Sequence, residues 1–162
     1  LAGHVEIDEA YVGGRAAGVG QGNYRSSKTT VVALMERKGR MIARVVPDAK
    51  TASIRPIVLE NVEKGSTIST DEWRSYGLLT NEGYRHGRVN HRAGEYARYV
   101  CKSLTFHTNT VEGFWRLFKA SVRSTHVHVS PKHMQRYLDE FSFRVNHRER
   151  VNGMFDLLVG AL

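Results

Sequence analysis

Cysteine, proline and long apolar runs are all scarce in this chain of 162 residues. Its single cysteine, Cys101, excludes an intrachain disulfide and is typical of a reducing compartment. No apolar stretch approaches the roughly 20 residues that a membrane-spanning helix needs, and the first residues show no signal-peptide pattern. The sequence therefore predicts a protein of the cytoplasm.

Acidic residues are fewer than basic residues. The chain has 24 Lys and Arg against 16 Asp and Glu, for a net charge of +8. That excess favours a polyanionic partner such as nucleic acid, although charge alone is equally typical of a solvated basic surface. Hydrophobic residues make up 41% of the chain, which is an ordinary globular value. We expect a single domain over residues 1–162.

The apolar pattern alternates between strand-like and helix-like segments. Runs of β-branched residues predict strands, and apolar spacings of three and four predict helices. The expected strands are residues 4–12, Thr29–Met35, Met41–Val46, Thr67–Thr70 and Tyr84–His91. The expected helices are Thr51–Glu63, one from about Thr108 and one from about Ser130-Pro131. This order predicts an α/β fold with a mixed sheet flanked by helices.

The two C-terminal helices each carry an apolar stripe that should face the core. The stripes are Val111, Phe114, Phe118 and Val122 in the first, and Met134, Tyr137, Leu138, Phe141 and Val145 in the second. Trp73 and Trp115 are interpreted as packing residues.

Three acidic residues have the placement that a divalent-metal site needs. Asp8 lies inside a strand-like run, Asp71 ends another, and Glu112 lies near the start of an expected helix. Hard oxygen ligands hold Mg²⁺, and two ions about 3.5–4 Å apart can clamp the attacking and leaving oxygens of a phosphodiester. Each acid also has a purely structural alternative. Asp8 could face solvent, Asp71 could cap the next segment, and Glu112 could form a capping box with Asn109.

Three cations follow Glu112 on one face of the same expected helix. Arg116, Lys119 and Arg123 lie four, seven and eleven positions after it, opposite the apolar stripe. This pattern is typical of a solvated face, but it equally suits one metal ligand beside cations that hold phosphates.

The combination of these motifs resembles the ribonuclease H-like fold of DDE transposases and retroviral integrases. Its local sequence motifs are similar to those of one group of bacterial insertion-sequence transposases, over about residues 4–150. The N-terminal motifs are Ile7-Asp8-Glu9-x-Tyr11-x-Gly13-Gly14, Thr70-Asp71-x-Trp73-x-x-Tyr76 and Val89-Asn90-His91. The C-terminal ones are His107-x-Asn109-x-x-Glu112-Gly113-Phe114-Trp115-x-x-x-Lys119 and His133-x-x-x-Tyr137-x-Asp139-Glu140-Phe141-x-Phe143-Arg144-x-Asn146.

The resemblance implies a role for each matching residue. Asp8, Asp71 and Glu112 would be the catalytic triad and would hold two Mg²⁺ or Mn²⁺ ions. Asn109 is the alternative third member, because an Asn carbonyl can also bind a hard cation. The predicted DNA contacts are Arg116, Lys119, Arg123 and His107. Glu9 should point to the opposite face of its strand and is left out.

The implied activity is metal-dependent cleavage at transposon ends, followed by strand transfer into target DNA. The implied partners are double-stranded DNA and further copies of the chain, in the nucleoid-associated cytoplasm of a bacterium. Since the chain begins at Leu1, we expect a fragment whose N-terminal DNA-binding part lies upstream. Two alternatives stay open: a nuclease that cuts without joining, and a non-catalytic DNA-binding domain from a decayed element.

Two weaker patterns carry less weight. The Gly-rich segment 13–28 lacks the ending of a nucleotide-binding loop, so it is either a plain loop or a DNA contact through Arg15, Arg25 and Lys28. The spacing of His126 and His128 does not match a zinc site.

Overall fold

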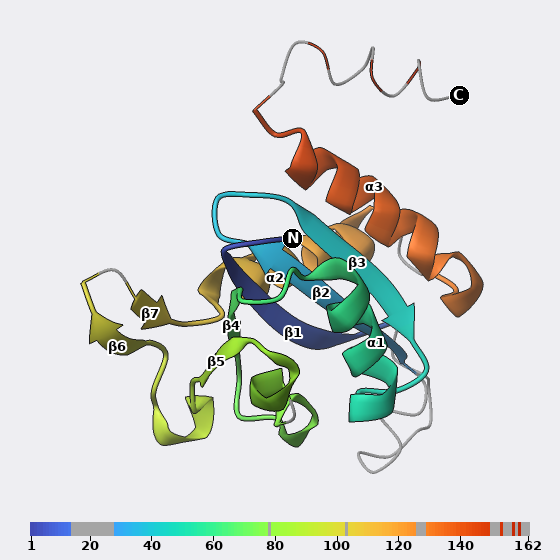
Figure 1. The fold of residues 1–162 in the computed structure, drawn as a ribbon. Helices are drawn as coiled ribbons and strands as arrows, with labels where there is room; N and C mark the ends of the chain where they lie inside the picture. The colour runs from blue at the N-terminus through green and yellow to red at the C-terminus, as the bar shows by residue number, and fades with distance from the viewer. Residues whose placement is uncertain are drawn as a thin grey trace.

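Five strands form one mixed sheet in a computed structural model that describes residues 1–13, 28–77, 79–102, 104–125, 129–149, 153, 157 and 159. The strands are β1 (His4–Val12), β2 (Thr29–Glu36), β3 (Met41–Val46), β4 (Thr67–Thr70) and β5 (Arg85–Arg88). Their order is β3-β2-β1-β4-β5 (Figure 1). Central β1 pairs antiparallel with β2 and parallel with β4. This α/β arrangement confirms the expected ribonuclease H-like fold.

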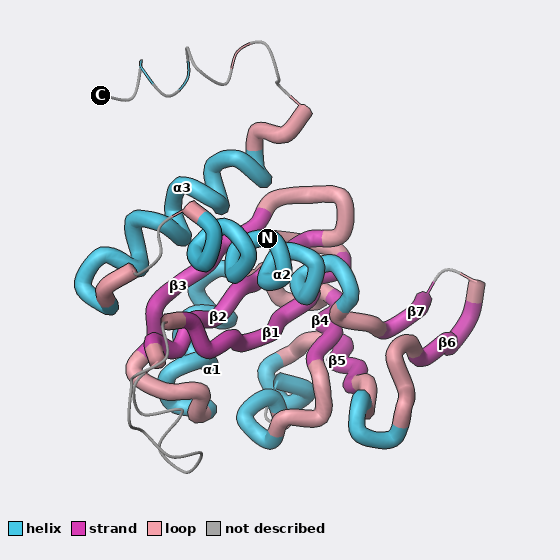
Figure 2. Tube along the Cα trace, turned by 180° about the vertical axis from the view of Figure 1, so that it is seen from behind, coloured by secondary structure: helices cyan, strands magenta, loops and turns pink. Residues whose placement is uncertain are grey.

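Helices cover both faces of the sheet, as Figures 1 and 2 show from opposite sides. α1 (Thr51–Asn61) packs on one face, while α2 (Asn109–Ser124) and α3 (Met134–Asn146) pack on the other. All three expected helices are therefore present. α3 begins later than expected, because residues 131–133 first form a 3₁₀ turn, to which Ser130 gives no side-chain cap.

Both predicted apolar stripes lie in the core. All four stripe residues of α2 are buried, and Trp115 is buried beside them. On α3, Met134 and Leu138 are fully buried, and the other three stripe residues pack partly buried against the same cluster. Phe118 joins the two helices, since its ring meets that of Phe141 edge-on with centroids 5.0 Å apart. Aromatic packing thus sets the position of α2 on the sheet.

A two-stranded sheet that the sequence did not predict lies beyond β5. It consists of β6 (Arg98–Cys101) and β7 (Leu104–Phe106), which pair antiparallel. Phe106 anchors this small sheet by packing its ring against Gly87 of β5. A Cβ atom at position 87 would lie only 2.2 Å from the nearest atom of the Phe106 ring. A side chain at position 87 would displace that ring, so the glycine permits the close approach.

Some expectations fall outside the described residues. They include most of the Gly-rich segment, with Arg15 and Arg25, and both His126 and His128. Within the described residues, no helix is both long and apolar enough to cross a bilayer.

Replacing Phe118 tests the core. Phe118→Ala should lower the free energy of unfolding by about 3–5 kcal/mol, because it leaves a cavity between α2 and α3. The neighbouring Leu117 is 70% exposed, so Leu117→Ala should cost no more than about 0.5 kcal/mol. Urea unfolding of both variants measures the difference, and equal losses would contradict this packing.

Candidate active site

Asp8 lies on β1, and Asp71 directly follows β4, the parallel neighbour of β1. In the β1–β4 register, Val5 pairs with Ile68 and Glu6 with Ser69, and Asp8 and Asp71 each come two residues after the last pair. Side chains alternate across a strand, so Asp8 shares the face of Glu6. That face is the one that α2 covers, because Glu6 bonds to the first turn of α2.

Electrostatics link these two carboxylates to Glu112 of α2. Burial raises the pKa of Asp8 well above its ordinary value, and the charges of Glu9, Asp71 and Glu112 raise it further. Burial also raises the pKa of Asp71, and the charges of Glu72 and Glu112 act in the same direction. The charge of Glu112 therefore disfavours the ionised forms of both aspartates, and a cation bound beside them would relieve this repulsion.

Asp71 also has a local structural role, although it is not the N-cap of the segment that follows. Its Oδ1 accepts a hydrogen bond of 2.9 Å from the backbone N–H of Trp73. This bond closes a turn before the 3₁₀ helix at residues 74–76, and it lowers the pKa of Asp71 against the effect of burial. The bond holds the carboxylate at the end of β4.

Glu112 is held by a threonine and a histidine rather than by a capping box. Thr108 Oγ1 donates to Glu112 Oε1 at 2.6 Å, and His91 Nε2 lies 3.1 Å from the same oxygen. Thr108 is the N-cap of α2, whereas Asn109 is its first helical residue and is exposed. His91 belongs to the motif Val89-Asn90-His91, for which the sequence predicted no role. The structure places His91 in the site, in contact with Glu112.

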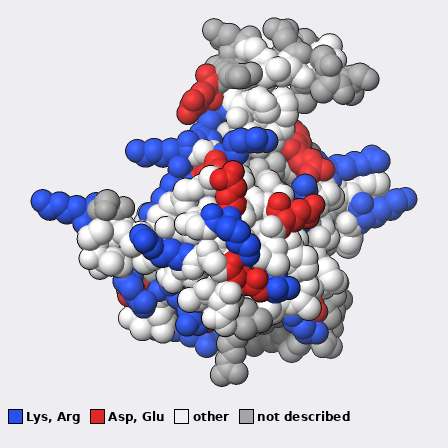
Figure 3. Space-filling view, in the orientation of Figure 1, with Lys and Arg blue, Asp and Glu red and all other residues white. Residues whose placement is uncertain are grey.

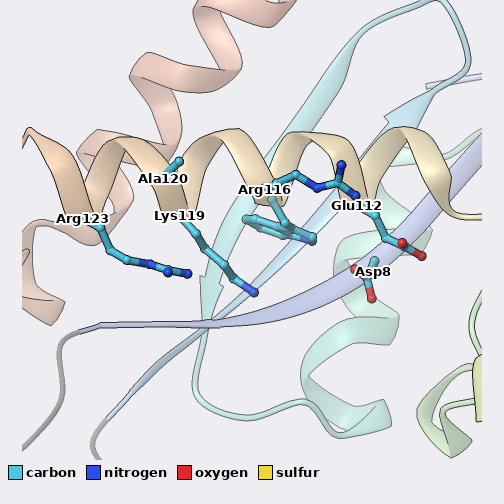
Figure 4. A pocket seen from close by; sticks show the side chains of 7 residues that line it. Asp8, Glu112, Arg116, Lys119, Ala120 and Arg123 are labelled. Carbon is cyan, nitrogen blue, oxygen red and sulfur yellow. The ribbon is translucent and has the colours of Figure 1, made fainter.

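A cavity of about 430 Å³ opens along α2 from this cluster. Figure 4 shows Asp8 and Glu112 at one end of it and Lys119 and Arg123 farther along the helix. Its lining consists of Asp8, Glu112, Trp115, Arg116, Lys119, Ala120 and Arg123. The structure thus gathers the three predicted phosphate-binding cations beside two of the three acids.

Asp71 and Asn109 are not among the lining residues. Within the described residues, no three His, Cys, Asp or Glu side chains are gathered closely enough to hold a metal ion as they stand. Glu112 Oε1 is instead engaged by Thr108 and His91.

At the start of α2 lies a buried carboxylate that the sequence analysis did not select. Glu6 of β1 is fully buried. Its Oε2 accepts hydrogen bonds from the backbone N–H groups of Thr110 (2.8 Å) and Val111 (3.2 Å), and its Oε1 accepts one from Thr110 Oγ1 (2.9 Å). Glu6 therefore caps α2 from outside the helix and adds a negative charge at its positive end. The available signal was its position two residues before Asp8, on the same strand face.

Arg37 compensates the charge of Glu6. Its Nε donates to Glu6 Oε1 at 2.8 Å, and its other nitrogens donate to the backbone oxygens of Thr105 (2.6 Å) and His107 (3.3 Å). One guanidinium thus joins β2, β1 and the segment that leads into α2. Such a bonded pair satisfies a charge that burial would otherwise make very costly.

Two histidines complete this network. His107 Nδ1 lies 3.1 Å from Glu6 Oε1, without the alignment of a hydrogen bond, and burial lowers the pKa of His107. His4 Nε2 lies 2.7 Å from Ser69 Oγ, and burial, with help from Arg37 and His107, lowers the pKa of His4 to about 4. The His4 imidazole is thus neutral near pH 7. The predicted DNA contact of His107 stays a prediction, since His107 lies outside the cavity lining.

The opposite face of β1 holds Glu9, as predicted. Tyr76, which is fully buried, donates its hydroxyl to Glu9 Oε2 at 2.5 Å. Glu9 therefore belongs to the α1 side of the sheet.

Taken together, the strand order and the acids on one sheet face define a ribonuclease H-like domain of the transposase class. The chain belongs to the ISXO2-like transposase domain family, whose model matches residues 1–146. It is also 29% identical over 114 residues to an "Uncharacterized transposase-like protein" of Haemophilus influenzae. That match covers 69% of this chain and 85% of the relative.

Replacing Glu6 tests its role as the cap of α2. Glu6→Ala should lower the free energy of unfolding by about 3–5 kcal/mol, because the N–H groups of Thr110 and Val111 lose their acceptor and the partly buried Arg37 loses its partner. Glu6→Gln should cost less, since its amide oxygen can still accept from the α2 backbone. The exposed Glu60 of α1 provides a control, and a Glu6→Ala loss no larger than that of Glu60→Ala in urea unfolding would exclude this role.

Proposed function

We propose that this domain cuts DNA at the ends of a mobile element and joins the freed 3′-hydroxyl to target DNA. The observation that carries the proposal is a cavity lined by Asp8, Glu112 and three cations, with Asp71 close enough for its charge to raise the pKa of Asp8. Phosphodiester chemistry needs both parts, namely a place for divalent metal and a place for the DNA backbone.

The donor set fits Mg²⁺ or Mn²⁺. Asp8, Asp71 and Glu112 offer hard carboxylate oxygens. Burial, with a smaller contribution from neighbouring carboxylates, raises the pKa values of the two aspartates, and a bound cation would favour their ionised forms. These three residues would hold two ions, which when bound supply Lewis-acid stabilisation of the attacking and leaving oxygens. Asn109 is the alternative to Glu112, and its exposed position at the start of α2 keeps it near the same end of the helix.

The remaining roles belong to the chain's own side chains. Arg116, Lys119 and Arg123 would bind successive backbone phosphates and hold the DNA in register with Asp8. His91 and Thr108 would orient Glu112. Positioning and charge neutralisation are the main contributions a protein makes to this chemistry, and no covalent enzyme intermediate is required.

We further propose that the partner is double-stranded DNA in the bacterial cytoplasm, beside the nucleoid. Joining two element ends to one target calls for two active sites, so we propose a homo-oligomer on DNA. The family and its transposase-like relative support this proposal over a nuclease that cuts alone and over a non-catalytic binding domain.

A supercoiled plasmid that carries the element's ends separates these functions. With Mg²⁺, the proposed function predicts cut ends and joined products. Cutting alone would indicate the nuclease, and a mobility shift without cutting would indicate the binding domain.

Replacing Asp71 separates catalysis from binding. Asp71→Asn can still accept the bond from Trp73 but loses its charge, so cleavage should fall about 100-fold or more. DNA affinity should stay the same or rise, because the phosphate contacts persist. The exposed Asp139 of α3 provides the matched control, Asp139→Asn. Near wild-type cleavage by Asp71→Asn would remove Asp71 from the site.

Replacing Lys119 tests the basic face of α2. Lys119→Ala should weaken DNA binding and reduce the salt slope of log K by about one, because one phosphate contact and its counterion release are lost. Strand transfer should slow more than in Arg40→Ala, a control in the β2–β3 turn. A salt titration decides the matter: if Lys119 is merely solvated or pairs with an acid, the slope stays unchanged within error.

A further inference from the structure

The small β6–β7 sheet presents an exposed aromatic surface. Tyr96, Tyr99 and Val100 are 64%, 79% and 58% exposed, and every residue of β6 is exposed. Figures 1 and 2 agree that these strands project from the β5 edge of the main sheet. We call Tyr96 and residues 98–102 the hairpin surface. Large apolar side chains gathered on a projecting element mark an interaction site more often than isolated ones do.

The hairpin surface belongs to a longer basic segment, residues 85–102. Residues 85–102 contain five Lys and Arg against one acid, Glu95, so they hold half of the net charge of +8. Arg98 pairs with Glu95, and Arg92 lies 3.5 Å from Glu72 while staying 83% exposed. In Figure 3, Lys and Arg side chains spread over this side of the molecule. The charge of the surface is complementary to a polyanion.

The hairpin surface is joined firmly to the candidate active site. Phe106 packs over Gly87, and Arg37 holds the backbone oxygen of Thr105, just before α2 begins at Asn109. On the other side, the rings of Tyr96 and His91 lie 5.5 Å apart, and His91 contacts Glu112. The Tyr96 end of the hairpin surface is therefore linked through His91 to Glu112.

We propose that the hairpin surface binds unpaired nucleotides of the DNA next to the cut, with Tyr99 stacking on a base and with Arg98 and Lys102 contacting phosphates. This inference rests on the proposed function. Exposed aromatic rings among cations are the recurring means of binding single strands, because every base offers a face for stacking. A second copy of this chain fits less well, since it carries the same positive charge.

The test compares two fluorescent DNA probes by anisotropy, a blunt duplex and the same duplex with a short single-stranded 3′ overhang. Tyr99→Ala should weaken binding of the overhang probe about tenfold, the usual size of one base–aromatic stack, and change the blunt probe by less than about twofold. Tyr99→Phe should behave as the wild type, because it keeps the ring. Leu117→Ala, an exposed apolar change on α2, should leave both probes unaffected.

Other outcomes overturn the inference. Equal losses on both probes would make Tyr99 a general duplex contact, and no loss on either would exclude stacking. A wild-type dimer in sedimentation that Tyr99→Ala dissociates, with overhang binding unchanged, would assign the surface to protein. A wild type that binds neither probe would defeat the proposed function as well, whereas wild-type binding that Tyr99→Ala leaves intact would defeat this inference alone.

Discussion

The buried carboxylate of Glu6 is the interaction on which the site depends. It lies on the central strand and accepts the backbone N–H groups of Thr110 and Val111, while Arg37 supplies its counter-charge. A buried charge is costly unless hydrogen bonds and a counter-charge satisfy it. The bonds of Glu6 therefore fix how β1, β2 and the start of α2 lie relative to one another. Glu112 follows Val111 directly, and its place above β1 is therefore set by Glu6.

That constraint explains why acidic groups with mutual repulsion share one sheet face. Aromatic packing around Phe118 and the Glu6 network hold α2 against β1, and parallel pairing holds β4 beside it. Burial and mutual charge then raise the pKa values of Asp8 and Asp71. Folding energy from the core thus offsets the cost of placing the carboxylates together, an arrangement typical of functional sites.

The sequence predicted the parts of this structure that depend on local patterns. Alternation in the strands and the stripes of α2 and α3 marked the sheet and the core, and the positions of Asp8, Asp71 and Glu112 marked one face. The role of Glu6 as the cap of α2 was not predicted, because its partners, Arg37 and the α2 backbone, are distant in sequence. The capping box of Asn109 and Glu112 does not form, because α2 begins one residue earlier, with Thr108 as its N-cap, and Glu112 Oε1 is engaged by Thr108 and His91. β6 was missed because its fully exposed residues carry no burial pattern.

The most direct test of the central claim is to locate metal in the protein itself. Crystals grown with MnCl₂ and measured at the manganese edge would show each ion by its anomalous scattering. The account predicts manganese in contact with carboxylate oxygens of Asp8, Asp71 and Glu112. Manganese bound only elsewhere, with Glu112 still held by Thr108 and His91, would contradict it, and contact with Asn109 in place of Glu112 would reassign the third ligand.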